Sequence, residues 1–136
     1  MLKWALIAAA LTAGPALACD CVQLIPGSPH FQSDLDRIAQ FYPVAAQGIV
    51  EADGPYAWRL RPTLEYRGTK QPSYRIELGS DCSLDPSEMN KLVGKSVFLL
   101  LGGGPDRYEA GRCVNLQSPE VEKALRARIG ADCHRR

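Results

Sequence analysis

The chain has 136 residues, which is enough for one domain but too few for two. Its 16 basic and 15 acidic side chains give a formal net charge of +1. A protein that binds nucleic acid or an anionic membrane surface would carry a clear basic excess, so the composition predicts neither kind of partner.

The first part of the chain has the pattern of a secretory signal peptide. A lysine precedes an apolar run, residues 4–11, and Ala16-Leu17-Ala18 fits a cleavage site. The run is much shorter than the roughly 20 residues of a membrane-spanning helix. We therefore expect residues 1–18 to be removed, which would leave residues 19–136 as one exported domain, secreted or periplasmic, that begins with Cys19.

All the cysteines lie beyond this cleavage site. The five are Cys19, Cys21, Cys82, Cys113 and Cys133. In an exported chain they indicate disulfide bonds rather than reduced thiols. A metal site is the weaker interpretation, because the sequence has no Cys-x-x-Cys pair and few histidines, so no metal or cofactor is expected. Disulfide geometry disfavours a bond between Cys19 and Cys21, but the spacing leaves the pairing open.

The sequence predicts a short helix before a series of strands. Ser33-Asp34 can cap a helix that runs to about Phe41, and Pro43 ends it. Apolar alternation between turn-forming stretches then predicts strands over residues 44–52, 56–66, 73–78, 96–101 and 107–114. A helical turn is expected at residues 85–89, between the third and fourth strands.

The second of these strands carries an aromatic row. The apolar residues that share one face are Tyr56, Trp58, Leu60, Leu64 and Tyr66. We interpret this face as barrel core. Pro62 lies within the row and implies an edge or a bulge, because proline donates no backbone hydrogen bond.

The last segment predicts a helix that covers the domain. Ser118 is a suitable N-cap for it. An apolar residue recurs at every fourth position, and this face would pack on the domain: Val121, Leu125 and Ile129. Gly130 would end the helix.

Five short strands with flanking helices favour a mainly β fold. We predict a five-stranded barrel of the oligonucleotide/oligosaccharide-binding type (OB-fold), with a short N-terminal helix and the C-terminal helix packed on it. A two-sheet sandwich is the competing architecture, but it would usually need about seven strands.

Several short motifs occur in one order along the expected mature chain. They are Cys19-x-Cys21-Val22, Phe31-x-Ser33-Asp34, Gly48-Ile49-Val50, Tyr66-Arg67-Gly68, Cys82 before a helical turn, Leu92-Val93-Gly94-Lys95, and Tyr108 ahead of Cys113. Together they resemble the N-terminal inhibitory domain of the tissue inhibitors of metalloproteinases (the TIMP family) and, more broadly, the netrin-like domain.

The resemblance implies a netrin-like barrel with disulfide bonds Cys19–Cys82 and Cys21–Cys113. It leaves Cys133 unpaired, or available to join two copies of the chain. In such proteins the first cysteine lays its α-amine and carbonyl oxygen on the catalytic zinc of a metalloprotease. An α-amine with a pKa near ~8 has a neutral fraction that can bind zinc, and the chelate would displace the water that the zinc activates.

The same resemblance implies which residues contact the protease. Asp20 would point into the specificity pocket of the enzyme, with Cys19 and Cys21 on either side of it. The flanking contacts would be Val22, Ser80, Asp81, Ser83 and Leu84. The zinc belongs to the target, so the chain would hold no metal of its own.

Two other interpretations are open. The chain could be a non-inhibitory netrin-like module that binds another protein, or a lipoprotein anchored to a membrane through Cys19, in which case lipidation would block the α-amine. An enzyme is not expected, because the sequence shows no Ser-His-Asp or Cys-His constellation.

Overall fold

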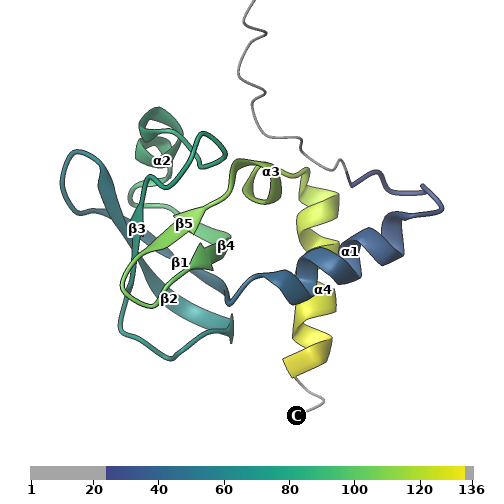
Figure 1. Cartoon of the computed structure of the whole chain (residues 1–136). Helices are drawn as coiled ribbons and strands as arrows, with labels where there is room; N and C mark the ends of the chain where they lie inside the picture. Colours follow the sequence, from purple (N-terminus) through teal and green to yellow (C-terminus); the bar gives the residue numbers. More distant parts are fainter. Residues whose placement is uncertain (1–23, 134–136) are drawn as a thin grey trace, which may run out of the picture.

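The computed structural model describes residues 24–133, which form a small barrel with helices around it (Figure 1). In chain order the elements are α1 (Phe31–Phe41), β1 (Val44–Ala52), β2 (Ala57–Arg67), β3 (Tyr74–Glu77), α2 (Pro86–Leu92), β4 (Ser96–Gly103), β5 (Tyr108–Ala110), α3 (Arg112–Asn115) and α4 (Pro119–Cys133). No helix within residues 24–133 combines the length and the apolar character needed to cross a membrane.

The strands form a closed barrel in the order β1-β2-β3-β5-β4, with β4 returning to β1. The β1–β2, β2–β3, β4–β5 and β1–β4 pairs are antiparallel, and the short β3–β5 pair is parallel. This confirms the predicted mainly β architecture, a five-stranded OB-fold-like barrel with flanking helices.

The pairing of β1 with β2 contains the bulge that Pro62 predicted. Gln47 lies opposite Leu64 and Gly48 lies opposite Pro62, so Thr63 is an extra residue on β2. A Cβ atom at Gly48 would lie 2.4 Å from the carbonyl oxygen of Arg61, so a side chain there would force the two strands apart. Glycine therefore allows the strands to stay close at the bulge.

The barrel interior is filled by apolar side chains from every strand and from α2. Its members are Val44, Ala46, Val50, Trp58, Leu60, Tyr74, Ile76, Leu84, Met89, Leu99, Leu101, Tyr108 and Ala110. The buried Trp58 indole donates a hydrogen bond from Nε1 to Oδ1 of Asn90 at 3.0 Å, which satisfies its polar atom.

The predicted aromatic row of β2 is core only in part. Trp58 and Leu60 are fully buried, but Tyr56 is 65% exposed and Leu64 is 55% exposed. Tyr56 lies in the turn before β2, and Leu64 follows the bulge, which shifts the alternation of the strand. Tyr66 packs outside the barrel, edge-to-face against Phe98 with ring centroids 5.6 Å apart.

A second apolar cluster lies between the barrel and the helices. Its buried members are Leu24, Leu35, Ala39, Ala45, Phe98, Leu100, Val114, Val121, Leu125 and Ile129. In Figure 1 α1 crosses α4 beside the barrel, as this cluster requires. The prediction that Val121, Leu125 and Ile129 pack on the domain is confirmed.

Several predicted element boundaries were wrong, and three of them are informative. The first helix starts at Phe31 rather than Ser33, and the Ser33 hydroxyl donates to the His30 carbonyl instead of capping the helix. The strand predicted over 107–114 ends at Ala110, because the chain turns into α3. Gly130 does not end α4, which continues to Cys133, since tertiary packing of the helix outweighs the low helix propensity of one glycine.

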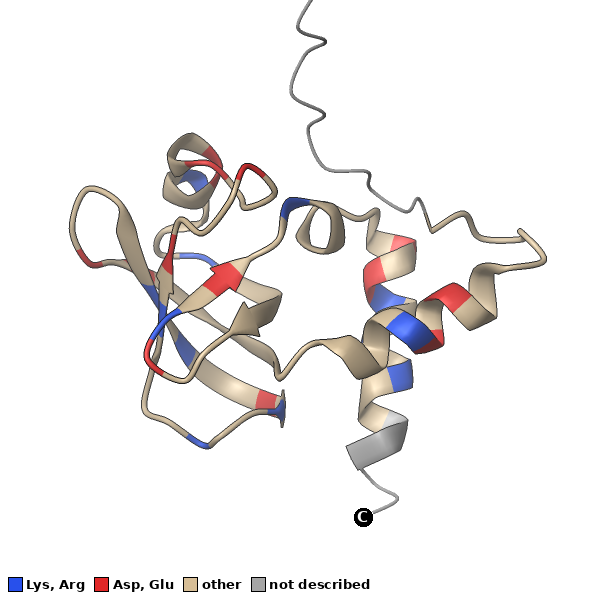
Figure 2. Cartoon of the chain, viewed as in Figure 1, with Lys and Arg blue, Asp and Glu red and all other residues tan. Residues whose placement is uncertain are grey.

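Charged residues of both signs are interspersed over the strands and helices (Figure 2). On the outer face of the barrel, Oδ2 of Asp53 accepts from Nε of Arg59 at 2.9 Å and from Nη1 of Arg75 at 3.0 Å. Arg61 pairs with Glu51 in the same way, at 2.9 Å. These basic side chains are therefore balanced by acidic neighbours.

Candidate functional site

The predicted contact residues fall into two groups. Cys19, Asp20, Cys21 and Val22 lie outside the described residues. Ser80, Asp81, Ser83 and Leu84 belong to the connection between β3 and α2, which we call the Cys82 loop and define as residues 79–84.

The Cys82 loop is joined to the segment that links β5 to α3. The amide of Leu84 donates to the Ala110 carbonyl at 2.8 Å, and the amide of Arg112 donates to the Cys82 carbonyl at 2.6 Å. An antiparallel bridge between Ser83 and Gly111 lies between these two bonds. The loop is therefore held in register with the segment where β5 gives way to α3.

This register brings the two described cysteines to adjoining segments. Cys82 lies in the loop, and Cys113 lies in the first turn of α3, one residue after Arg112. Both are disulfide-bonded. The pairing with Cys19 and Cys21 remains a proposal, because those two cysteines lie outside the described residues.

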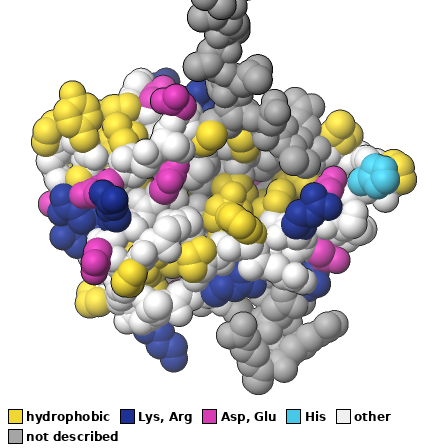
Figure 3. Space-filling model, in the orientation of Figure 1, with side chains coloured by type: hydrophobic (Ala, Val, Ile, Leu, Met, Phe, Trp, Pro, Cys, Tyr) yellow, Lys and Arg dark blue, Asp and Glu magenta, His cyan; other side chains and the backbone are white. Residues whose placement is uncertain are grey.

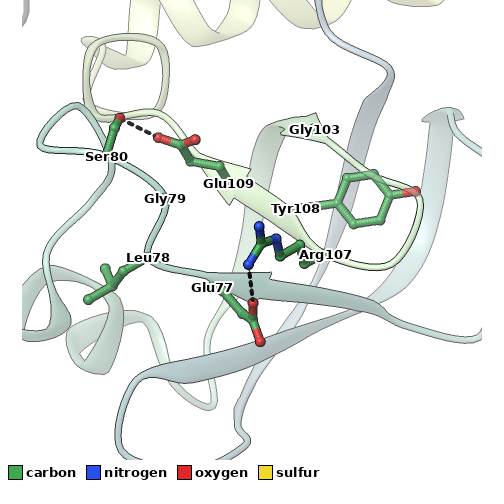
Figure 4. Close-up of a pocket in the computed structure, with 8 residues that line it drawn as sticks. All are labelled: Glu77, Leu78, Gly79, Ser80, Gly103, Arg107, Tyr108 and Glu109. Atoms are coloured by element: carbon green, nitrogen blue, oxygen red, sulfur yellow. Dashed lines mark hydrogen bonds and ion pairs between the residues drawn. The ribbon is translucent and has the colours of Figure 1, made fainter.

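A carboxylate on β5 holds the Cys82 loop through hydrogen bonds. Oε1 of Glu109 accepts a hydrogen bond from the hydroxyl of Ser80 at 2.7 Å (Figure 4). The same oxygen accepts a second one from the hydroxyl of Ser83 at 2.5 Å. These two bonds stabilise the ionised form and hold the pKa of Glu109 below its ordinary value, against the opposing effect of partial burial. Burial is the main cause that raises the pKa of Tyr42, and the negative charge of Glu109 raises it further.

The hydroxyls that bind Glu109 also receive the amides of the loop. Ser83 Oγ accepts from the amides of Gly79 and Ser80, each at 3.3 Å. Ser80 Oγ accepts from the amide of Cys82 at 3.2 Å. Two serine hydroxyls thus connect one carboxylate to three amides of an irregular segment.

The burial of the loop corrects the prediction for two of its residues. Ser83 is 5% exposed and Leu84 is 2% exposed, and Leu84 belongs to the barrel core. They hold the loop from the inside and offer no side-chain surface to a partner. Ser80 and Asp81 are exposed, so they are the residues of the predicted set that remain available in the described part of the chain.

A cavity of about 260 Å³ lies between β3 and β5, next to the loop (Figure 4). Glu77 and Arg107 form one side of it, with Nη1 of Arg107 3.8 Å from Oε2 of Glu77. Glu109 and Ser80 form the other side. Glu109 is thus bound by the hydroxyls of the Cys82 loop, whereas Arg107 pairs with Glu77.

Arg112 connects the start of α3 to α2. Its Nη2 donates to Oε1 of Glu88 at 2.8 Å and lies 3.5 Å from Oδ2 of Asp85. Asp85 and Glu88 form the capping box of α2. The backbone hydrogen bond from Glu88 is the largest cause of a lowered pKa at Asp85, and the positive charge of Arg112 adds to it.

Sequence patterns did not reveal Glu109 or Arg112. The alternation of Tyr108, Glu109 and Ala110 indicates that Glu109 faces outward, but its hydrogen-bond partners lie in a distant loop. Within residues 24–133 no three or more of His, Cys, Asp and Glu are placed to hold a metal ion together.

Exposed apolar side chains also occur on the face of the molecule that Figure 3 draws. In the space-filling view, hydrophobic side chains occur in separate patches with charged residues between them (Figure 3). Leu78, which directly precedes the Cys82 loop, is 40% exposed.

Comparison of the chain with family models, curated proteins and solved structures found no match.

Proposed function

We propose that the chain is an exported, disulfide-stabilised inhibitor of a zinc metalloprotease, with Cys19 as the residue that binds the catalytic zinc. The observation that carries the proposal is the fixed juxtaposition of Cys82 and Cys113 on the Cys82 loop and α3. In the proposed pairing these cysteines bind Cys19 and Cys21.

Such an anchorage would explain how a short terminal segment could act as a zinc ligand. A free N-terminus samples many conformations, and ordering it on an enzyme costs free energy. Two disulfide bonds to adjoining, hydrogen-bonded segments would remove most of that cost before binding. The α-amine and carbonyl oxygen of Cys19 could then reach the zinc together and displace the water needed for hydrolysis.

The exposed part of the Cys82 loop supplies the second element of the proposal. Ser80 and Asp81 lie beside Cys82 and would contact the protease next to the chelating residue. The proposed role of Asp20 is to enter the specificity pocket, where a buried carboxylate needs hydrogen-bond donors or a cation. Targets with a polar or basic pocket are therefore favoured over those with an apolar one.

The test is one alanine added before Cys19 in a chain processed to residues 19–136. The added residue turns the α-amine of Cys19 into an amide, which cannot bind zinc as an amine does. Inhibition across a panel of zinc endopeptidases should fall by at least about a hundredfold, which corresponds to about 2.8 kcal/mol of binding free energy. A matched chain with one alanine added after Arg136 should inhibit like the unmodified chain.

Equal inhibition by the two extended chains would contradict chelation by Cys19. The intact, non-reduced mass of the exported protein separates the alternatives that involve no inhibition. A mass raised by acyl chains identifies a membrane-anchored lipoprotein. An unmodified Cys19 without inhibition of any protease in the panel favours a non-inhibitory binding module.

A further inference from the structure

We infer that Glu109 is a positioning residue for the proposed inhibitory edge: through Ser80 and Ser83 its carboxylate fixes the Cys82 loop, and with it the anchor of Cys19. The inference rests on the proposed function. Its structural part can be judged separately, because the loop and the carboxylate both lie among the described residues.

The Glu109 carboxylate is bound by loop hydroxyls and not by the nearby arginine. Glu109 shares a cavity with Arg107, a side chain whose charge could neutralise an acid. Arg107 is paired instead with Glu77, and Glu109 Oε1 accepts two hydroxyl hydrogen bonds at 2.7 and 2.5 Å. Hydrogen bonds to an ionised acceptor are stronger than those between neutral groups, so this carboxylate is a firm anchor for the loop.

The hydrogen bonds of Glu109 extend through the two serines to the backbone of the Cys82 loop. A serine hydroxyl that donates to Glu109 has its lone pairs free to accept from backbone amides. Ser83 accepts from Gly79 and Ser80, and Ser80 accepts from Cys82. The carboxylate thereby orients both hydroxyls, and the hydroxyls orient the amide that belongs to the cysteine itself.

Gly79 leaves space for the Glu109 carboxylate. A Cβ atom at Gly79 would lie 2.3 Å from Oε2 of Glu109, a distance that no real contact tolerates. The glycine therefore allows the loop to pass directly over the carboxylate. In Figure 4 the Glu109 side chain extends toward Ser80, away from the Glu77–Arg107 pair.

The experiment compares Glu109→Gln with Glu77→Gln in the processed chain, residues 19–136. Both substitutions remove one charge from the same cavity, but only Glu109 contacts the loop hydroxyls in the described structure. Amide hydrogen exchange is measured by nuclear magnetic resonance. We expect the amides of Gly79, Ser80 and Cys82 to exchange at least about tenfold faster in Glu109→Gln and at wild-type rates in Glu77→Gln.

Two further amides report whether the barrel and the β5–α3 junction stay intact. Leu84 and Arg112 donate to backbone carbonyls rather than to serine, so their exchange rates should not change in Glu109→Gln. Loop amides that keep wild-type rates would overturn the inference. A tenfold increase shared by Leu84 and Arg112 would overturn it as well, because Glu109 would then stabilise the whole fold rather than position the loop.

A second variant tests the same hydrogen-bond network through a different residue. Ser83→Ala removes the hydroxyl that receives two of the amides, and it should speed the exchange of Gly79 and Ser80 to a similar extent. The double variant Glu109→Gln/Ser83→Ala should add little to either single variant, since both act through one network. Fully additive effects would contradict a shared network.

The functional arm uses any zinc endopeptidase that the unmodified chain inhibits. Glu109→Gln should raise the inhibition constant by about tenfold, mainly through faster dissociation, and Glu77→Gln should leave it unchanged. If the loop amides loosen but inhibition by the variant equals that of the wild type, the positioning role is wrong. If the unmodified chain inhibits no enzyme, the proposed function fails, and with it the part of the inference that depends on it, whereas the amides still decide how the loop is held.

Discussion

The two sides of the barrel are held by different forces. On the helical side, α1 and α4 bury apolar residues such as Leu35 and Leu125 against Ala45, Phe98 and Leu100 of β1 and β4. On the side of the Cys82 loop, Leu84 packs in the barrel core, but the loop is otherwise held by hydrogen bonds to one carboxylate and to the backbone of the β5–α3 junction.

The helical side contributes mainly to the stability of the fold, whereas the loop side determines the conformation of one segment. Apolar burial is non-directional and contributes in proportion to the area removed from water, so the helical side stabilises the fold without fixing fine detail. Hydrogen bonds contribute less free energy but demand a set distance and angle. The loop side is therefore suited to hold a segment in one conformation, as the proposed inhibitory edge requires.

The strongest test of this comparison is Leu125→Ala on the helical side. Leu125 is 1% exposed, and its truncation leaves a cavity between α4 and the barrel. We expect a loss of about 2–5 kcal/mol in the free energy of unfolding, measured by urea denaturation. The exposed Leu116→Ala is the control and should change stability by less than about 0.5 kcal/mol.

The matching substitution on the loop side is Glu109→Gln. It keeps the size of the side chain and weakens two hydrogen bonds, so we expect a loss of only about 1 kcal/mol. Urea denaturation measures this loss, and the amide exchange rates of the loop should change much more than the stability does. A loss as large as that of Leu125→Ala would show that the two sides do not differ as described.

Acid should loosen the loop side when Glu109 becomes protonated. The pKa of Glu109 is held below its ordinary value of 4.5, so its contribution to stability is complete above that value and is lost as the pH falls through the lowered pKa. The charged and titratable groups near it include Tyr42, Glu77, Arg107 and Tyr108. Chemical shifts of the Ser80 and Ser83 amides should therefore titrate below pH 4.5, and in Glu109→Gln this titration should disappear.

The smallest effect is expected for the ion pair on the surface of α4. Nη2 of Arg126 lies 2.8 Å from Oε1 of Glu122, and both side chains are more than a third exposed. A solvated pair of this kind contributes about 0.3–0.5 kcal/mol, so Glu122→Ala should lower stability by no more than that. Raising the salt concentration should reduce the difference between the variant and the wild type in thermal denaturation.

The sequence predicted elements well where neighbouring residues determine them. The strand predicted over residues 44–52 coincides with β1, and the four-residue spacing of Val121, Leu125 and Ile129 identified the buried face of α4. Periodicity reports which face of an element is apolar, and that property is local. The five strands and their flanking helices were therefore enough to indicate the barrel.

Prediction failed where one part of the chain changes the environment of another. The alternation of β2 placed Leu64 in the core, but the bulge at Thr63 turns it outward. Ser83 and Leu84 were assigned to a contact surface, although both are buried in the loop that pairs with Gly111. Neither change can be read from spacing, because each depends on a partner strand or segment.

By itself, the sequence determined the order of the elements, the five-stranded architecture and the apolar face of the C-terminal helix, since adjacent residues carry those signals. Only the tertiary structure decided that Glu109 anchors the Cys82 loop, whose Ser83 lies 26 residues away in the chain. It also decided that Arg112 joins the start of α3 to the cap of α2. Barrel closure brings these groups together, and contacts between distant residues leave no periodic trace in the sequence from which they could be predicted.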